Sequence, residues 1–209
     1  MGRRRLHGED TRNALLVAAE QLVAEHGIDA LSVRKVAARA GTTTRAVYVL
    51  FGSKDSLLEA LARHSFELLM AAMEAVPPRS DPGEDLVTRS VKGFRAFALE
   101  HPDLFRLFFA TRTPRAIWSA GATATRSAAY AQLTALVGRA QRAGLLGVRD
   151  VEEATLLWDA LCTGLALREI CGPIPQSEGE RLWSDALQAL LRGMGPEAGT
   201  TINPAARSR

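Results

Sequence analysis

Apolar residues recur at intervals of three and four positions along most of this 209-residue chain, and no stretch alternates as a half-buried strand does. The pattern therefore predicts an all-α protein. Gly27 ends the first periodic segment, and Gly41 stands where a left-handed C-terminal cap is expected. Ser32 and Ser53 can each cap the helix that follows. The helices expected in this part of the chain span about residues 10–26, 33–40, 44–51 and 54–76.

Prolines and capping boxes divide the rest of the chain into further helices. Pro77-Pro78 stops the long helix, and Asp81-Pro82-Gly83-Glu84 is typical of a capping box with proline at the first helical position. His101-Pro102 ends the helix that begins there. Asp150-x-x-Glu153 and Ser177-x-x-Glu180 are two more capping boxes. The later helices are expected at about residues 82–100, 104–110, 113–144, 151–171 and 178–194.

Residues 33–51 combine a short helix, a glycine turn and a second short helix, which is the spacing of a helix-turn-helix unit. The second helix has two faces of different chemistry. One face recurs at helical intervals and is expected to pack on the preceding helices through Ala46, Val47, Leu50 and Phe51. The opposite face presents Thr44, Arg45, Tyr48 and Val49.

This second face suits the major groove of DNA. Thr43 or Thr44 can cap the helix and donate a hydroxyl to phosphate, and the helix N-terminus itself favours an anion. Arg45 can pair with the edge of guanine, and Val49 can rest on a thymine methyl. A polar face that only meets water would show the same pattern. The candidate DNA-contacting residues are Arg34, Thr43, Thr44, Arg45, Tyr48, Val49 and Lys54.

The net charge of +3 is distributed unevenly along the chain. Residues 1–54 hold nine Lys and Arg against five acidic residues, a net of +4, and the remaining residues have a net of −1. Such an excess at one end is typical of a polyanion-binding surface, although a basic terminus that aids solubility would give the same count. Arg3, Arg4 and Arg5 would follow the DNA backbone or enter the minor groove, or else form a disordered start.

The stretch LSVRKVAARAGTTTRAVYVLFGSKDSLLEAL resembles the DNA-binding domain of TetR-type transcriptional regulators, and the likeness covers roughly residues 10–69. The resemblance implies that Thr43, Tyr48 and Lys54 contact phosphate. It also implies that Thr44 and Arg45 face bases. The positions that carry the likeness are Ala40-Gly41, Thr42 to Thr44, Tyr48, Phe51, Ser53-Lys54 and Leu57-Leu58.

The sequence departs from that family pattern in three places. Leu50 stands where many members have histidine, and Gly52 where many have proline. The segment GFRAFALEHPDLFRLFFA is similar to an effector-domain subtype that also has a late Trp-His-Gly signature. Here Trp158 and Gly164 match, but Thr163 replaces the histidine, so any role of that histidine does not carry over.

Large apolar side chains are concentrated between residues 66 and 158, and apolar pockets between helices are the usual sites for small ligands. Plain core packing is the alternative for each of these residues. The polar groups able to orient a ligand are Arg95, His101, Arg112 and Asp159. The candidate ligand-binding residues are Phe66, Met70, Phe94, Phe97, Phe105, Phe109, Trp118 and Trp158.

The last two helices carry continuous apolar stripes, and two such helices from each subunit would form a four-helix bundle. A dimer would hold two recognition helices about one DNA turn apart, or a multiple of that, which predicts a pseudo-palindromic operator. The candidate interface residues are Leu157, Leu161, Leu165, Trp183, Leu187, Leu190 and Leu191.

Several classes of function lack support in the sequence. Cys162 and Cys171 show neither a disulfide framework nor zinc-ligand spacing and fit a reducing cytoplasm. No apolar stretch suits a signal peptide or a membrane span. The four histidines have no metal spacing, and no nucleophile elbow, phosphate loop or carboxylate pair is present, so neither an enzyme nor a cofactor is expected.

The sequence thus predicts a homodimeric, ligand-responsive repressor that a small hydrophobic effector releases from its DNA operator. The alternatives are a helical protein-interaction module and a small-molecule-binding protein with low catalytic activity. The expected organisation is a basic flexible arm at 1–9, a helix-turn-helix domain at 10–56, a linking helix at 54–76, an effector-binding and dimerisation domain at 77–195, and a disordered tail at 196–209.

Overall fold

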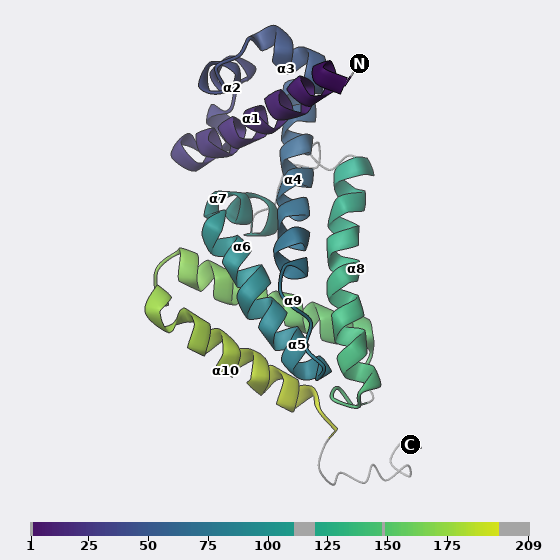
Figure 1. Ribbon diagram of the computed structural model, residues 1–209. Coiled ribbons are helices and arrows are strands. Elements are labelled where there is room, and N and C mark those ends of the chain that lie inside the picture. Colours follow the sequence, from purple (N-terminus) through teal and green to yellow (C-terminus); the bar gives the residue numbers. More distant parts are fainter. Residues whose placement is uncertain (1, 111–119, 148, 197–209) are drawn as a thin grey trace, which may run out of the picture.

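The structure is a computed structural model that describes residues 2–110, 120–147 and 149–196. Within those ranges the chain forms helices and turns without a strand, which confirms the all-α fold. The first three helices form a small unit at one end of α4, and α4 runs from it into the larger group of α5 to α10 (Figure 1). The α-helices are α1 (Gly2–His26), α2 (Val33–Arg39), α3 (Thr44–Phe51), α4 (Lys54–Glu74), α5 (Pro82–Arg89), α6 (Arg95–Glu100), α7 (Pro102–Phe105), α8 (Ala120–Arg142), α9 (Val151–Ile170) and α10 (Gln176–Met194).

Side-chain caps set the bounds of the helix-turn-helix as the sequence predicts. The Thr43 hydroxyl oxygen accepts a hydrogen bond from the Ala46 amide at 3.2 Å and so starts α3. Ser32 and Ser53 each accept from the amide three residues ahead in the same way, and so start α2 and α4. Gly41 has a φ of 65°, the left-handed conformation that lets the chain turn sharply from α2 towards α3.

The N-terminal helix is longer than the sequence predicts. It begins at Gly2, so residues 2–9, expected as a flexible arm, form its first turns. Arginine and leucine are good helix formers, no proline interrupts them, and extending an existing helix is easier than starting one. The predicted tail beyond Pro196 lies outside the described residues, as do Thr113 and Pro114, where a helix was expected to start.

The segment predicted as one helix over 82–100 is helical throughout but changes pitch in the middle. A π-helical turn, Ser90–Phe94, separates α5 from α6. Gly93 in this turn packs closely against α4. A Cβ added at position 93 would lie 2.9 Å from the Met73 Cα. Ser90 donates its hydroxyl proton to the Leu86 carbonyl and accepts a hydrogen bond from the Trp158 indole at 2.9 Å. Tertiary contacts therefore accompany the change of pitch.

Alanine at position 93 will destabilise the fold. The added methyl meets the α4 backbone, which cannot move aside as a side chain tip can, so we expect Gly93→Ala to lower the free energy of unfolding by about 1–3 kcal/mol. Thermal unfolding followed by circular dichroism measures the change. Gly193→Ala is the matched control, because no atom lies within 4 Å of a Cβ there. An unchanged melting temperature for Gly93→Ala would show that α4 and the π-helical turn are not packed this tightly.

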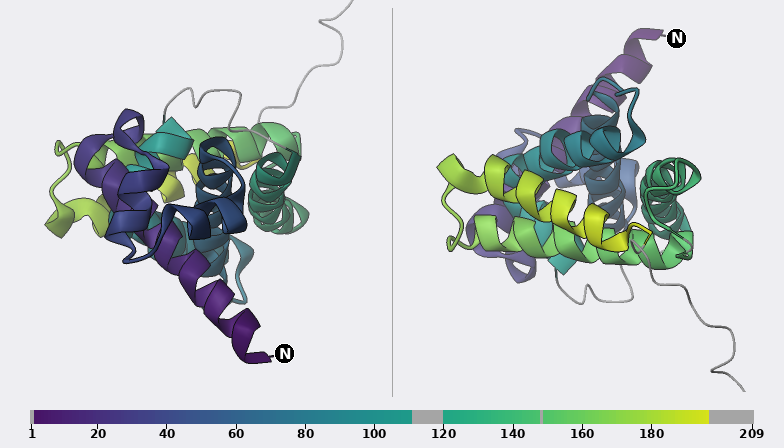
Figure 2. Two further views of the ribbon diagram at one scale, coloured as in Figure 1. Left: turned by 90° about the horizontal axis from the view of Figure 1, so that it is seen from above. Right: turned by 90° about the horizontal axis from the view of Figure 1, so that it is seen from below.

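The last two helices form an antiparallel pair (Figures 1 and 2). Asp150 caps α9 as predicted and accepts from the Glu152 amide at 2.7 Å. The capping box predicted at Ser177-x-x-Glu180 is wrong. Helix α10 begins at Gln176 without a side-chain cap, and the Glu180 carboxylate accepts a hydrogen bond from Lys92 instead. That ion pair fastens α10 to the π-helical turn before α6.

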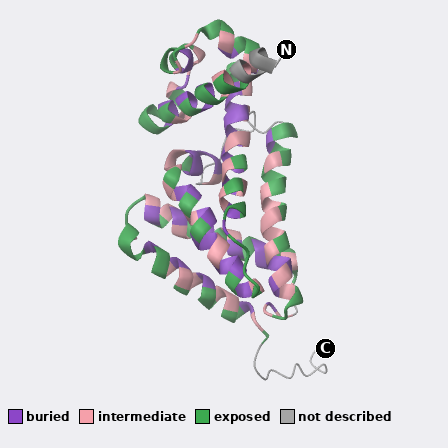
Figure 3. Cartoon of the chain, in the orientation of Figure 1, coloured by how far each residue is buried: buried purple, intermediate pink, exposed green. Residues whose placement is uncertain are grey.

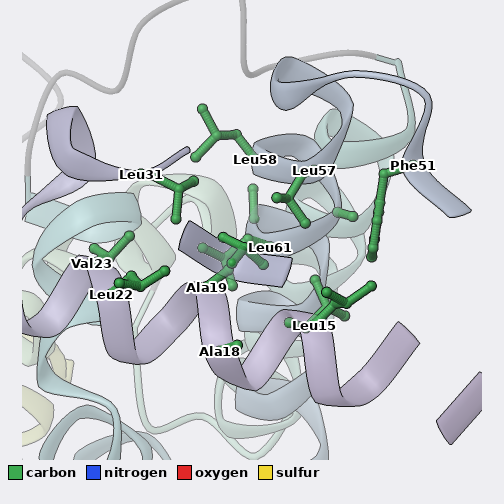
Figure 4. Packing of buried hydrophobic residues seen from close by; sticks show 14 of the residues in the cluster. Leu15, Ala18, Ala19, Leu22, Val23, Leu31, Phe51, Leu57, Leu58 and Leu61 are labelled. Carbon is green, nitrogen blue, oxygen red and sulfur yellow. The ribbon is translucent and has the colours of Figure 1, made fainter. Parts of the chain in front are cut away.

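Buried residues form two core clusters. The first joins α1, α2, α3 and the N-terminal part of α4 around Leu15, Leu57 and Leu61 (Figure 4). It also contains Leu104, Phe108 and other residues from beyond residue 77, so the core does not divide at the predicted domain boundary. The second cluster fills the space between α5, α6, α9 and α10 and includes the two tryptophans Trp158 and Trp183, each with no exposed surface.

Candidate functional site

The outer face of α3 is largely exposed among the residues that the structure describes. Tyr48 is 55% exposed and Val49 is 75% exposed, although both are large side chains in a short helix. The opposite face is anchored, since Val47 is 1% exposed and Phe51 is 8% exposed in the first core cluster. Leu50 packs against that same cluster, as its position in the helical period predicts.

One side-chain contact and one glycine turn orient α3. The Arg12 guanidinium of α1 lies over the Phe51 ring, 5.3 Å from its centroid, which is a cation–π geometry. Gly52, with a φ of 82°, ends α3 and turns the chain into α4. These features orient the C-terminal end of α3, so its outer face has a defined orientation.

The surface around α3 carries positive charge. Arg34 of α2, Arg45 of α3 and Lys54 of α4 are exposed, and within the described residues no carboxylate pairs with them. Arg39 differs, because it forms a bidentate ion pair with Glu25 of α1, and that hydrogen bonding lowers the pKa of Glu25. The candidate DNA-contacting residues, all of them exposed, are Arg34, Thr43, Thr44, Arg45, Tyr48, Val49 and Lys54.

A cavity of about 1100 Å³ lies in the larger helical group, between α4, α8, α9 and the two π-helical turns. The second π-helical turn, Arg106–Ala110, follows α7 directly. Helix α8, which forms one wall, is mostly exposed or half-buried (Figure 3). Its buried residues are Ala122, Val137, Gly138 and Ala140. The cavity volume is that of sites for drug-sized molecules.

The predicted ligand residues divide between the cavity wall and the core. Phe66, Phe94 and Phe109 line the cavity. Phe97 and Phe105 are buried beside it, where Phe105 stacks on Phe109 with ring centroids 5.0 Å apart. The remaining predicted residues are Met70 and Trp158, which are not part of the wall, and Trp118, which lies outside the described residues.

Polar groups enter the cavity mainly from α8 and α9. Asp159 of α9 is half-buried in the wall, and this burial raises the pKa of its carboxyl, which the charge of Arg126 lowers by less. Burial and the nearby carboxylates Glu152 and Asp159 raise the pKa of Tyr130. Burial also strongly raises the pKa of the Cys162 thiol, so this cysteine is inert at neutral pH.

Sequence reasoning missed most of the α8 wall. Thr123, Arg126, Tyr130 and Gln132 line the cavity, yet none was a candidate because small and polar residues on a helix usually face water. The signal available in the sequence is that residues 119–132 contain no Leu, Ile, Val, Met, Phe or Trp, so this part of the helix has no core-forming stripe. Of the other polar candidates, Arg95 pairs with Glu169, His101 pairs with Glu20, and Arg112 lies outside the described residues.

The structure corrects part of the predicted dimer interface. Trp183 and Leu187 have no exposed surface and lie in the second core cluster, because α10 turns its apolar stripe towards α5 and α9 of its own subunit. Leu157 is 40% exposed on α9. The other predicted residues pack only partly against the core and keep some exposed surface, namely Leu161, Leu165, Leu190 and Leu191.

The cavity wall and α3 share one core cluster. Phe66 of α4 and Phe108 of the second π-helical turn line the cavity and belong to the same core cluster as Val47 and Phe51 of α3. His101 also donates from Nδ1 to Glu20 of α1 at 2.6 Å, which ties the start of α7 to α1. A change in the cavity wall can therefore reach α3 through packed side chains.

The described part of the chain has neither a metal-binding cluster nor a membrane-spanning helix. No group of three or more His, Cys, Asp or Glu side chains is placed to bind a metal ion there. None of the helices described has both the length and the apolar character needed to cross a membrane.

The helices α2 and α3 with their glycine turn, held on α1, define a helix-turn-helix protein. Residues 15–61 match the family described as "Bacterial regulatory proteins, tetR family", and residues 87–190 match "Tetracyclin repressor-like, C-terminal domain". Together these matches cover most of the chain, and the protein belongs to the TetR family of bacterial regulators.

The matches to curated relatives each cover about half of the chain or less. The HTH-type transcriptional repressor LfrR of Mycolicibacterium smegmatis is 38% identical over 84 residues, covering 40% of this chain and 43% of LfrR. The nicotine-responsive repressor HdnoR of Paenarthrobacter nicotinovorans is 33% identical over 101 residues, covering 48% of this chain and 46% of HdnoR. The matched regions span about half the length of these curated relatives.

Solved structures are similar over nearly the whole chain. A TetR-family transcription regulator from Marinobacter aquaeolei VT8 has a TM-score of 0.71 and 26% identity, covering 88% of this chain and 97% of that one. A protein of unknown function from Rhodococcus sp. RHA1 has a TM-score of 0.73 and 25% identity, covering 89% and 95%. RolR in complex with resorcinol has a TM-score of 0.60 over 93% and 92%, and its 19% identity shows the shared fold alone.

Proposed function

We propose that the protein is a homodimeric transcriptional repressor that binds a pseudo-palindromic operator through α3 and leaves it when a small molecule fills the cavity. The observation that carries this proposal is the outer face of α3, which is exposed, basic and rigidly anchored. Val49 and Tyr48 each leave more than half of their surface uncovered. Both suit a groove that offers thymine methyls and phosphates.

Each side chain of this face has a distinct role in the proposal. Arg45 reads guanine, and Val49 packs on a thymine methyl. Tyr48 and Lys54 hold the phosphate backbone, joined by the hydroxyls of the threonines at the start of α3. Arg34 of α2 reaches the same backbone. These roles require DNA, which places the action of the protein in the bacterial cytoplasm and makes it a regulator rather than an enzyme.

Dimerisation through α9 and α10 would supply the second recognition helix. The exposed side of α9 contains Leu157 and Gly164, and no atom lies within 4 Å of a Cβ placed on that glycine, so a second helix can approach closely. The partly exposed leucines Leu161, Leu165 and Leu190 would complete a four-helix contact.

Release of DNA would follow from the contacts between the cavity wall and α3. A ligand that displaces Phe66 or Phe108 would shift α4 and, with it, the spacing of the two recognition helices. A ligand that binds this shifted state more tightly lowers operator affinity to the same extent, because the coupling is reciprocal.

Salt-dependent binding to duplex DNA tests the proposal. Fluorescence anisotropy of a labelled duplex, measured from low to high salt, should show affinity falling with a slope of about −0.9 per phosphate contact. The Lys54→Ala variant should reduce that slope, whereas Lys92→Ala, remote from α3, should not. A protein-interaction module would show no salt-dependent binding to DNA at all.

A further inference from the structure

The cavity combines an aromatic floor with an acidic side. Phe66, Phe94 and Phe109 meet there, with the Phe66 and Phe109 ring centroids 4.8 Å apart and those of Phe94 and Phe109 6.3 Å apart. Glu152 and Asp159 of α9 line the same space. Aromatic faces and carboxylates both attract positive charge, and neither attracts an anion.

A positively charged ligand would stabilise the carboxylate of Asp159. It is half-buried in the wall, and within the described residues no side chain donates a hydrogen bond to its carboxylate. The nearby Arg126 acts on it through charge, but that side chain is exposed at the edge of the cavity, where water screens it. A carboxylate held in this way costs free energy that a positive charge inside the cavity would recover.

We propose that the effector of this protein is a bulky apolar organic cation, whose charge lies beside Asp159 and whose apolar groups pack on Phe66, Phe94 and Phe109. This inference rests on the proposed function, since it names the ligand class of the same cavity. A neutral apolar ligand would bury Asp159 further without a partner. An anion would have to enter beside two carboxylates, with one exposed guanidinium to offset them.

Two probes of equal shape and opposite charge test the ligand class. Tetraphenylphosphonium is a permanent cation and tetraphenylborate a permanent anion, and both carry four phenyl groups. Isothermal titration calorimetry on the full-length protein should show binding of the phosphonium ion at least about tenfold tighter than of the borate ion, because a charge interaction in a partly buried site contributes more than 1.4 kcal/mol. Equal affinities, tighter borate binding or no binding of either ion would overturn the proposal.

Variants then locate the charge. Asp159→Asn keeps the shape of the side chain and should weaken phosphonium binding about tenfold or more while leaving borate binding unchanged or stronger. Glu180→Gln is the matched control, because it removes an exposed carboxylate outside the cavity. An unchanged phosphonium affinity in Asp159→Asn would contradict the assignment. If that variant does not fold, as judged by circular dichroism, the comparison of the two ions on the unmodified protein still decides.

The ligand class and the proposed function can be tested separately. Operator binding by the ligand-free protein tests the regulator, and it does not depend on which molecule fills the cavity. A protein that binds DNA with steep salt dependence but prefers the borate ion would keep the function and lose the ligand class.

Discussion

Replacing Glu169 by alanine will lower the free energy of unfolding by about 3–5 kcal/mol. The Glu169 side chain has no exposed surface, and its carboxylate accepts hydrogen bonds from Arg95 at 2.6 and 2.9 Å and from the Trp183 indole at 3.0 Å. Arg95 is only 13% exposed, so the alanine variant leaves a largely buried guanidinium without a counter-charge. The loss corresponds to a fall in melting temperature of roughly 10 °C for a chain of this length.

A surface ion pair between α10 and the π-helical turn before α6 serves as the control. Lys92 and Glu180 are each more than half exposed, so Glu180→Ala should change the free energy of unfolding by less than about 1 kcal/mol. Urea unfolding at one fixed protein concentration compares the two variants without interference from a dimerisation equilibrium. If Glu169→Ala is no less stable than Glu180→Ala, then α6, α9 and α10 are not joined through this carboxylate.

Replacing Arg45 by alanine will abolish most discrimination between operator and unrelated DNA. A good contact to a guanine edge contributes about 1–3 kcal/mol, and in a dimer both half-sites lose it, so operator affinity should fall by about 2–6 kcal/mol. Affinity for an unrelated duplex should fall much less. Competition binding with the operator and a scrambled duplex measures both affinities at the same salt concentration.

Lys54→Ala is the matched comparison for Arg45→Ala, since both remove one positive charge from the same surface. A phosphate contact carries no sequence information, so Lys54→Ala should weaken operator and scrambled duplex alike. Equal losses on both duplexes for Arg45→Ala would refute base reading by that residue and would leave it as a second phosphate contact.

The helix-turn-helix could be predicted almost to the residue because local chemistry specifies it. Thr43 and Ser53 cap their helices through bonds within four residues, and Gly41 turns the chain by its own backbone freedom. The two faces of α3 follow from the helical period alone, so the burial of Val47 and the exposure of Val49 were both readable from the sequence.

The larger helical group could be predicted only in outline, because its details depend on contacts between distant residues. The apolar stripe of α10 is compatible with a dimer interface or a subunit core, and only packing against α5 and α9 assigns Trp183 to the core. The π-helical turn at Gly93 coincides with close packing against Met73, twenty positions earlier in the chain. The cavity wall from α8 likewise depends on where that helix lies, since Arg126 and Tyr130 have no apolar pattern of their own.

Selection of DNA from a random pool is the most direct test of operator binding by a pair of α3 helices. The purified protein is mixed with random-sequence duplexes, and the bound fraction is amplified and sequenced over several rounds. A dimer with two α3 recognition helices should enrich sequences with two related half-sites in dyad symmetry, whose centres lie about 10 base pairs or a multiple of that apart. A pool that shows no enrichment, or enrichment without dyad symmetry, would contradict operator binding by a pair of α3 helices.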